Sequence, residues 1–346
     1  MSIALINSIA TLHKIFCANR RQLSKTATTL RKKRIKQSFH TPVLLDETIE
    51  GLNLQKHSNP IVLDMTFGAG GHSKEILIRH KNCHVIALDR DIKAHNIAKD
   101  LAQEFRKRVT PLLGKFSEVD HLLKSHGYSE SSLDGVIIDA GCSSMQFDEA
   151  ERGFSLSKDG PLDMRMDGTR NSSQVTAADV VNYLSLKDLT EIIGKYGQER
   201  YPEKIAQSIV ENRPFSRTKQ LAEAIGNAFS ISNHMIRMDA IGRRCHSATK
   251  TFMALRIFVN DELNELHTGI EMAEKFLKND GRLATITFHS LEHKIVRKLL
   301  NKRGGDGHSP WHPDKEDYAK PFLSELETNP RSRSAFLRVA TRTRKT

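Results

Sequence analysis

Apolar runs alternate with stretches of helical periodicity over residues 61–139, and this alternation limits the fold more than any other feature. The expected strands are 61–65, 84–89, 109–113 and 133–139. The expected helices are 71–80, 93–105 and 117–126. Strands separated by helices of this length form βαβ units, so the sequence predicts an α/β fold around a parallel sheet.

The alternation stops after the fourth strand. No strand is expected between about residues 150 and 279, where 186–195, 202–212 and 218–229 have helical patterns. Sheet elements resume with a strand at 282–288, a helix at 291–300 and a last strand at 336–341. We therefore expect three parts. They are a leader at 1–37, a sheet domain at 38–149 and 246–346, and a helical inserted domain at 150–245 that recognises the substrate.

Charge is concentrated at the two ends of the 346-residue chain, whose net charge is +12. Residues 1–40 hold nine lysines or arginines and residues 329–346 hold six, with no acidic residue in either stretch. The body between them is therefore slightly acidic, so a polyanionic partner is allowed but not required. Four widely separated cysteines without a CxxC pair indicate a reducing compartment and no zinc site. No apolar run reaches the roughly 18 residues that span a bilayer, so no membrane span is expected.

The first residues have the composition of a mitochondrial targeting segment. Five apolar side chains fall on one helical face, those of Leu5, Ile6, Ile9, Leu12 and Phe16, and basic, serine and threonine residues follow without acids. A basic arm that contacts nucleic acid is the alternative interpretation. Import predicts a location in the mitochondrial matrix.

A glycine-rich loop follows the first strand, in the segment "VLDMTFGAGGHSKEI" at 62–76. A strand that ends in glycines before a helix brings backbone N–H groups against a dinucleotide, a phosphate or S-adenosylmethionine. The match to GxGxxG is incomplete because Ser73 replaces the third glycine. Asp64 could order the loop or meet a ligand's ammonium group. Asp89 ends the next strand, where an acid would bind both ribose hydroxyls of either NAD or S-adenosylmethionine.

The fourth strand distinguishes between these ligands. It ends in Asp139, at the edge where open α/β sheets hold ligands, and it is followed by small residues, Gln146 and the run "GPLDMRMD". A carboxylate there suits the positive sulfonium of a methyl donor better than a nicotinamide. A plain strand-end cap is the alternative interpretation of Asp139.

Longer motifs extend over nearly all of the chain after the leader. They include "FHTPVLLDE", "TFGAGGHS", "DGPLDMRMD", "YGQERYPEKIAQSIV", "ATKTFMALRIFVNDEL", "GRLATITFHSLEHKIVRKLL" and "NPRSRSAFLRVA". In these motifs the chain resembles the ribosomal RNA small-subunit methyltransferase H family, which methylates cytosine N4. The resemblance implies a class I S-adenosylmethionine-dependent (Rossmann-like) methyltransferase sheet with a helical insertion, and a small-subunit rRNA or assembling subunit as substrate. The leader places the chain with the mitochondrial members.

The resemblance also implies a set of donor-binding residues. The glycine loop provides three of them, Asp89 would bind the ribose and Phe116 the adenine, and two more would lie near the methionine end. The full set is Gly70, Gly71, His72, Asp89, Phe116, Asp139 and Gln146. The chain departs from the family pattern at Cys142, Met145, Ser247 and Lys250, which concerns the target loop and RNA contacts rather than the donor site.

The cytosine amino group is a poor nucleophile, so the enzyme must polarise it with an acceptor or remove its proton. Many amino methyltransferases use an Asp/Asn-Pro-Pro-aromatic run after the fourth strand, whereas this chain has "DAGC". Asp139 is therefore the candidate catalytic acceptor, and no residue is assigned to stack on the base. His289 could line the base pocket or be a structural histidine.

The remaining polar features have plainer interpretations. The basic stretches 243–250 and 331–344 could contact phosphates or form solvated faces. His308 and His312 stand in a Gly/Pro loop without a ligand pattern, and no metal is expected.

The sequence is also compatible with two alternatives to the methyltransferase, an NAD-dependent oxidoreductase and a non-catalytic rRNA-binding assembly factor. The sequence does not decide the oligomeric state, and a homodimer is not excluded.

Overall fold

The computed structural model describes residues 42–229, 236–238, 244–303, 309–312 and 318–343. The expected leader at 1–37 lies outside these residues. The chain divides into two compact units, a sheet unit built from Phe39–Gln146, Met166–Arg170 and Asp261–Thr346, and a helical unit built from Phe147–Arg165 and Asn171–Asn260.

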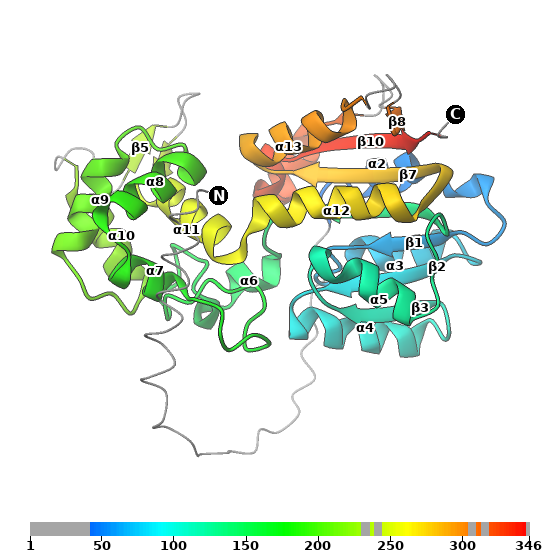
Figure 1. The fold of residues 1–346 in the computed structure, drawn as a ribbon, viewed down its shortest axis with the longest axis horizontal. Coiled ribbons are helices and arrows are strands. Elements are labelled where there is room, and N and C mark those ends of the chain that lie inside the picture. The colour runs from blue at the N-terminus through cyan, green and yellow to red at the C-terminus, as the bar shows by residue number, and fades with distance from the viewer. Residues whose placement is uncertain (1–41, 230–235, 239–243, 304–308, 313–317, 344–346) are drawn as a thin grey trace, which may run out of the picture. The chain divides into compact units, whose positions relative to one another are not determined.

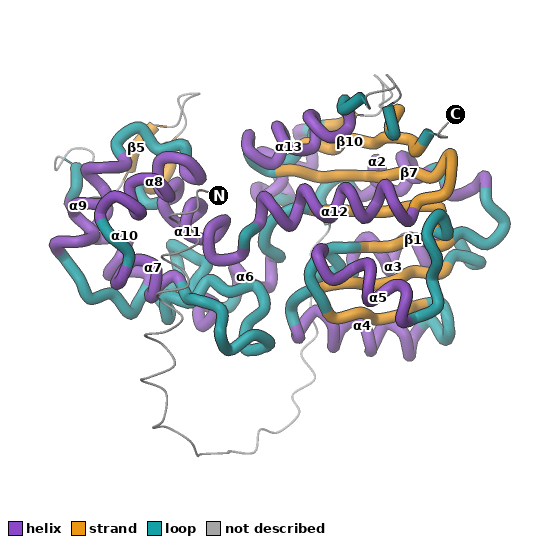
Figure 2. The backbone as a smooth tube through the Cα atoms, viewed as in Figure 1, coloured by secondary structure: helices purple, strands orange, loops and turns teal. Residues whose placement is uncertain are grey.

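The sheet unit contains the strands β1 to β4 and β7 to β10 and the helices named below (Figures 1 and 2). Its strands are β1 (Ile61–Asp64), β2 (His84–Asp89), β3 (Val109–Leu113), β4 (Leu133–Asp139), β7 (Leu277–Thr287), β8 (Trp311–His312), β9 (Tyr318–Ala319) and β10 (Phe336–Arg342). Its α-helices are α2 (Leu45–Leu52), α3 (Gly71–Arg79), α4 (Ile92–Glu104), α5 (Val119–Ser125), α12 (Glu262–Phe276), α13 (Ser290–Leu300) and α14 (Leu323–Thr328). Short 3₁₀ turns occur at Leu54–Lys56, Phe116–Glu118 and Pro330–Ser334.

The strands form one sheet in the order β3-β2-β1-β4-β7-β10-β8, with β9 paired to β10. β1, β2, β3, β4 and β7 are parallel, and β10 is antiparallel to β7. The chain order reverses between β1 and β4, and ligands of open α/β sheets bind outside the carboxyl ends of the strands at such a point. The α/β class I methyltransferase sheet expected from the sequence is confirmed.

Helices cover both faces of this sheet because its inner strands are apolar on both sides. Buried side chains of α2, α3 and α4 pack with Val62, Val85 and Ile137 on one face. Those of α5, α12 and α13 pack with Leu63 and Ile86 on the other. The two cores hold the strands, and therefore the ends of the strands, in fixed register.

A buried carboxylate fastens the short segment Met166–Arg170 to the sheet unit. Asp167 is fully buried and pairs with Arg90, with Arg170 at 3.0 Å and with Lys115 at 3.9 Å. Several cations around one buried carboxylate offset the cost of removing its charge from water. The acidic end of the "GPLDMRMD" run is thus part of the sheet unit.

The helical unit contains α7 (Ala177–Tyr183), α8 (Leu186–Gly197), α9 (Pro202–Glu211), α10 (Thr218–Asn227) and α11 (Thr249–Asn260). Two short antiparallel strands, β5 (Ile236–Met238) and β6 (Arg244–His246), and the 3₁₀ turn Ala150–Arg152 complete it. Helix α6 (Ser144–Asp148) contains the point where the two units divide.

Two expectations about strands are wrong. The expected absence of strands between 150 and 279 misses β5 and β6, and β7 begins at Leu277 instead of residue 282. Residues 278–281 are polar and end in glycine, and Asp280 has φ +65°. The chain nevertheless pairs on both sides of this irregularity, Leu277 with Leu133 and Arg282 with Gly135. In the part of the chain that the structure describes, no helix is long and apolar enough to cross a membrane.

Candidate functional site

Three aspartates lie at the carboxyl ends of adjacent parallel strands. Asp64 ends β1, Asp89 ends β2 and Asp139 ends β4. Their charges influence one another, because Asp64 contributes to raising the pKa of both Asp89 and Asp139. The sheet therefore gathers an acidic set of side chains at the edge where a ligand is expected.

The glycine loop and the start of α3 are packed too tightly for side chains at two positions. Gly70 has φ +81°, and a Cβ there would lie 2.5 Å from the Phe67 ring. A Cβ on Gly71 would lie 2.2 Å from Pro42. Both glycines are thus required by the local packing, which brings the loop backbone to the helix start.

Ser73 has a role that explains why it replaces the third glycine of the fingerprint. Its hydroxyl donates to Asp64 Oδ2 at 2.6 Å, while Thr66 N donates to Oδ1 at 3.1 Å. Burial raises the pKa of Asp64 to about 6 despite these bonds. Asp64 therefore orders the glycine loop by accepting hydrogen bonds from Thr66 and Ser73, one on each side of it.

His72 lies in the first turn of α3. Its ring is buried with Nε2 3.2 Å from the carbonyl oxygen of Val43, and burial lowers its pKa to about 4. The side chain is thus neutral and fixed. The N–H groups of the first turn of α3 have no partner within the helix, so they are suited to an anionic group.

Asp89 fastens the glycine loop to the turn after β2. Its Oδ2 accepts from Gly68 N at 2.7 Å and its Oδ1 accepts from Asp91 N at 2.8 Å. Burial raises its pKa to about 6. Asp91, not Asp89, caps the following helix, accepting from Lys93 N at 3.0 Å. Asp89 itself is therefore not the cap of α4, and its remaining lone pairs can accept hydroxyl groups.

Gln146 is buried, and its amide is bonded within the protein. Its Nε2 donates to Asp91 Oδ2 at 3.0 Å and Ser143 N donates to its Oε1 at 3.1 Å. The structure therefore places Gln146 beside the turn after Asp89, where it holds the loop after β4. Asp91 was missed from the sequence, although the "DRD" run before a helix is a cap signal.

Phe116 begins the 3₁₀ turn after β3 and is partly buried against the sheet core. A Cβ on Gly269 of α12 would lie 2.9 Å from its ring, so the absence of a side chain there makes room for the aromatic group. The ring therefore lies on the face of the sheet that α5, α12 and α13 cover.

Of the three aspartates, Asp139 has the fewest hydrogen bonds to its carboxylate among the described residues. Its backbone N donates to Thr66 Oγ1 at 2.7 Å, but its buried Oδ1 has no hydrogen-bond partner among the described residues. Burial, helped by the charges of Asp64 and Glu292, raises its pKa to about 8. An opposite charge or a hydrogen-bond donor at this point would favour the carboxylate.

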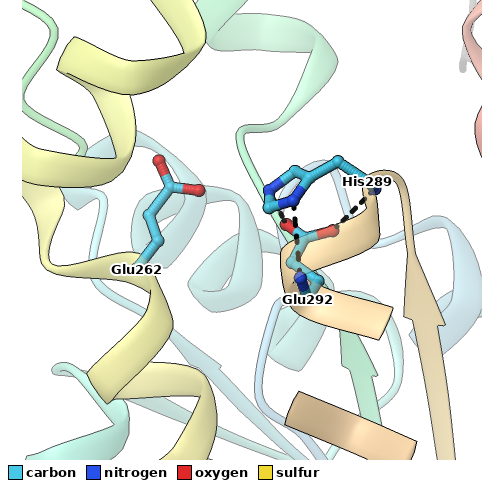
Figure 3. Close-up of side chains that lie close together, drawn as sticks. All are labelled: Glu262, His289 and Glu292. Atoms are coloured by element: carbon cyan, nitrogen blue, oxygen red, sulfur yellow. Dashed lines mark hydrogen bonds and ion pairs between the residues drawn. The ribbon is translucent and has the colours of Figure 1, made fainter. Parts of the chain in front are cut away.

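His289 lies at the same edge, because β7 pairs with β4 and ends two residues earlier. Figure 3 shows it with Glu292 of α13 and with Glu262, the first residue of α12. The ligand-type atoms of the three side chains lie within 4.8 Å of one another. Neither glutamate was identified from the sequence, because they lie in the first turns of two different helices.

The basic stretches are only partly described. Arg338 lies over the Phe336 ring and Arg342 donates to the carbonyl oxygen of Glu274, so both arginines contact the protein itself. Lys250 donates to the carbonyl oxygen of Gln198. Residues 239–243 and His308 lie outside the described residues.

Comparison with known proteins identifies the family. The model of the MraW methylase family matches residues 37–343. This chain belongs to the MraW methylase family. It is 43% identical over 336 residues to the 12S rRNA N(4)-cytidine methyltransferase METTL15 of Homo sapiens, covering 87% of this chain and 82% of that one. It is 41% identical over 321 residues to the ribosomal RNA small subunit methyltransferase H of Hyphomonas neptunium, covering 88% and 89%.

Family membership confirms the resemblance drawn from the motifs and decides against the oxidoreductase. The near-GxGxxG loop and Asp89 are compatible with either ligand, and the extended motifs carry the distinction. The individual donor-site residues stay predictions.

Proposed function

We propose that this protein transfers a methyl group from S-adenosylmethionine to N4 of a cytidine in mitochondrial small-subunit (12S) rRNA, in support of small-subunit maturation. The observation that carries this proposal is the family match over residues 37–343, with relatives of this named activity at 43% identity. The three aspartates at the carboxyl edge of the sheet also suit a positively charged methyl donor.

The residues present suit this donor. Asp139 Oδ1 is buried without a partner among the described residues and faces an environment in which its charge is disfavoured, so a cationic sulfonium would satisfy it. The start of α3 at Gly71 and His72 would hold the methionine carboxylate through backbone N–H groups. When bound, S-adenosylmethionine supplies an electrophilic methyl group on positively charged sulfur.

Other residues would fix the nucleoside part of the donor. Gly70 allows the loop backbone to approach, Asp89 would accept the ribose hydroxyls, and Phe116 would pack against the adenine. Gln146 would act indirectly by holding Asp91 and the loop after β4, since its amide is bonded within the protein.

Asp139 is the proposed catalytic residue. Its carboxylate would accept a hydrogen bond from the target amino group, offsetting the positive charge that develops on nitrogen as the new bond forms. Holding the nucleophile in line with the methyl carbon contributes further, because positioning removes the entropy cost of a bimolecular encounter.

We further propose that the helical unit takes part in recognising rRNA or the assembling small subunit, and that residues 1–37 direct import into the mitochondrial matrix. These two proposals rest on the relatives' rRNA substrate and on the composition of the leader.

Nucleoside mass spectrometry of small-subunit rRNA tests the function. Cells lacking the protein should lack N4-methylcytidine at one position, and re-expression of the wild-type chain should restore it. Unchanged rRNA would reject the proposal. Restoration of ribosome assembly by a variant that does not bind the donor would instead indicate a non-catalytic assembly factor.

A further inference from the structure

The group formed by Glu262, His289 and Glu292 is not used by the mechanism above. Glu292 is buried in the first turn of α13, and its Oε2 accepts from Phe288 N at 2.7 Å and from His289 N at 3.3 Å. The glutamate thus fixes the backbone that carries His289 (Figure 3).

The hydrogen bonding of the ring determines which nitrogen of His289 carries the proton. Glu292 N lies 3.4 Å from Nδ1 and, as a backbone N–H, can only donate, so Nδ1 accepts. In the neutral imidazole the proton is then on Nε2. Nε2 is buried, and although Glu292 Oε1 is 3.0 Å away, Nε2 makes no hydrogen bond in the described parts of the chain. The site therefore contains a fixed N–H donor that is not aimed at a protein acceptor.

This tautomer disfavours a metal ion between the three side chains. A metal would bind the lone pair of Nε2 and leave the proton on Nδ1, facing the N–H of Glu292. Histidines that bind metals usually direct the other ring N–H at a carbonyl or carboxylate, the opposite arrangement. An acceptor on a ligand satisfies Nε2 without this conflict.

The strand end that carries His289 lies next to the strand end that carries the proposed catalytic residue. Ala140 N donates to the carbonyl oxygen of Ile286 at 2.9 Å, which joins the loop after Asp139 to the end of β7 just before His289. The Glu292 charge also contributes to the raised pKa of Asp139. A base that binds against Asp139 would therefore lie near His289.

We propose that His289 and Glu262 recognise the Watson–Crick edge of the target base: His289 Nε2–H donates to N3, and the Glu262 carboxylate accepts one hydrogen of the N4 amino group. This inference rests on the proposed function. A carboxylate offers about four acceptor positions, so Glu262 can do this alongside its protein contacts. The second amino hydrogen is left for Asp139.

The same arrangement rejects uracil. Uracil presents an N3–H donor to the imidazole N–H and an O4 acceptor to the carboxylates, so both contacts become repulsive. Sites that leave buried polar groups unpaired discriminate strongly against the wrong ligand.

The test combines one enzyme variant with one substrate atom. His289→Asn keeps an acceptor for Glu292 N at the helix cap but is too short to reach the base. The matching substrate is a small-subunit rRNA fragment with 3-deazacytidine at the target, in which N3 is replaced by C–H. Single-turnover methylation is measured for both enzymes on both substrates at saturating donor, with donor affinity measured separately by calorimetry.

We expect His289→Asn alone, or 3-deazacytidine alone, to lower the methylation rate about tenfold beyond any intrinsic effect of the altered base. The two changes together should lower the rate no further than either one does. The intrinsic effect of the deaza ring cancels because it is present in both enzymes. Glu262→Gln should also lower the rate while leaving donor affinity near normal. His293→Asn is the matched control, because His293 lies one turn further along α13 against Phe336 and Arg338, and it should show no coupling to N3.

Multiplicative losses in His289→Asn and 3-deazacytidine would overturn the inference and leave His289 a structural cap. Loss of wild-type activity on chelation, restored by zinc or manganese, would also overturn it in favour of a metal. A wild-type enzyme that forms no N4-methylcytidine would overturn the proposed function and this inference together. A wild-type enzyme that is active but shows no coupling between His289→Asn and the 3-deazacytidine substitution would reject this inference alone.

Discussion

Binding of the methyl donor should release a proton from Asp139. Burial and the charges of Asp64 and Glu292 raise the pKa of this carboxyl to about 8, so it is mostly protonated at pH 7 without ligand. A sulfonium beside it stabilises the carboxylate and lowers the pKa in the complex. Because the bound state then holds fewer protons than the free state, donor affinity must rise as pH rises toward and through 8.

The size of the effect follows from the pKa. With a value of about 8, roughly a tenth of the free protein is ionised at Asp139 at pH 7 and roughly nine-tenths at pH 9. Donor affinity should therefore increase about tenfold over this range, or about 1.4 kcal/mol. Asp64 and Asp89, with pKa values of about 6, are already ionised above pH 7 and contribute little.

Calorimetry with S-adenosylmethionine and S-adenosylhomocysteine isolates the effect. The two ligands share the ribose, the adenine and a titrating α-amino group, and they differ in the charge on sulfur. The ratio of their dissociation constants should change about tenfold between pH 7 and 9 in the wild type and stay flat in Asp139→Asn. A constant ratio in the wild type, or an equal slope in the variant, would refute the assignment of this proton to Asp139.

Three further outcomes are expected. Asp89→Ala should weaken donor binding at least about tenfold in calorimetry, because it removes the proposed ribose acceptor and frees the loop amide of Gly68; unchanged affinity would restrict Asp89 to a structural role. Asp139→Asn should lower the single-turnover methylation rate by a factor of ~10²–10⁴ at saturating donor, since the amide lacks the charge that offsets developing positive nitrogen; a normal rate would place polarisation of the amino group elsewhere. A fluorescent protein fused to residues 1–45 should enter mitochondria while a chain starting near residue 38 still methylates rRNA, and a diffuse cytosolic signal would favour a nucleic-acid-binding arm.

Local sequence determined several strands of the parallel sheet. The strands at 84–89, 109–113 and 133–139 were predicted with the bounds that β2, β3 and β4 have, because short apolar-rich runs between polar turns have few alternative structures. The sequence likewise placed Asp64, Asp89 and Asp139 at one edge, since the carboxyl ends of parallel strands coincide.

Tertiary structure decided the features that depend on a partner. The short strands β5 and β6 exist through their pairing, and Leu277 joins β7 because Leu133 lies opposite it beyond a polar irregularity. No pattern in the sequence brings Glu262 to His289, since that meeting depends on how two helices are rotated against the sheet. The tautomer of His289 is set by a backbone N–H of the following helix turn. Such contacts form only when the packed elements fix distance and direction together, so the sequence located the edge of the site and the fold determined its chemistry.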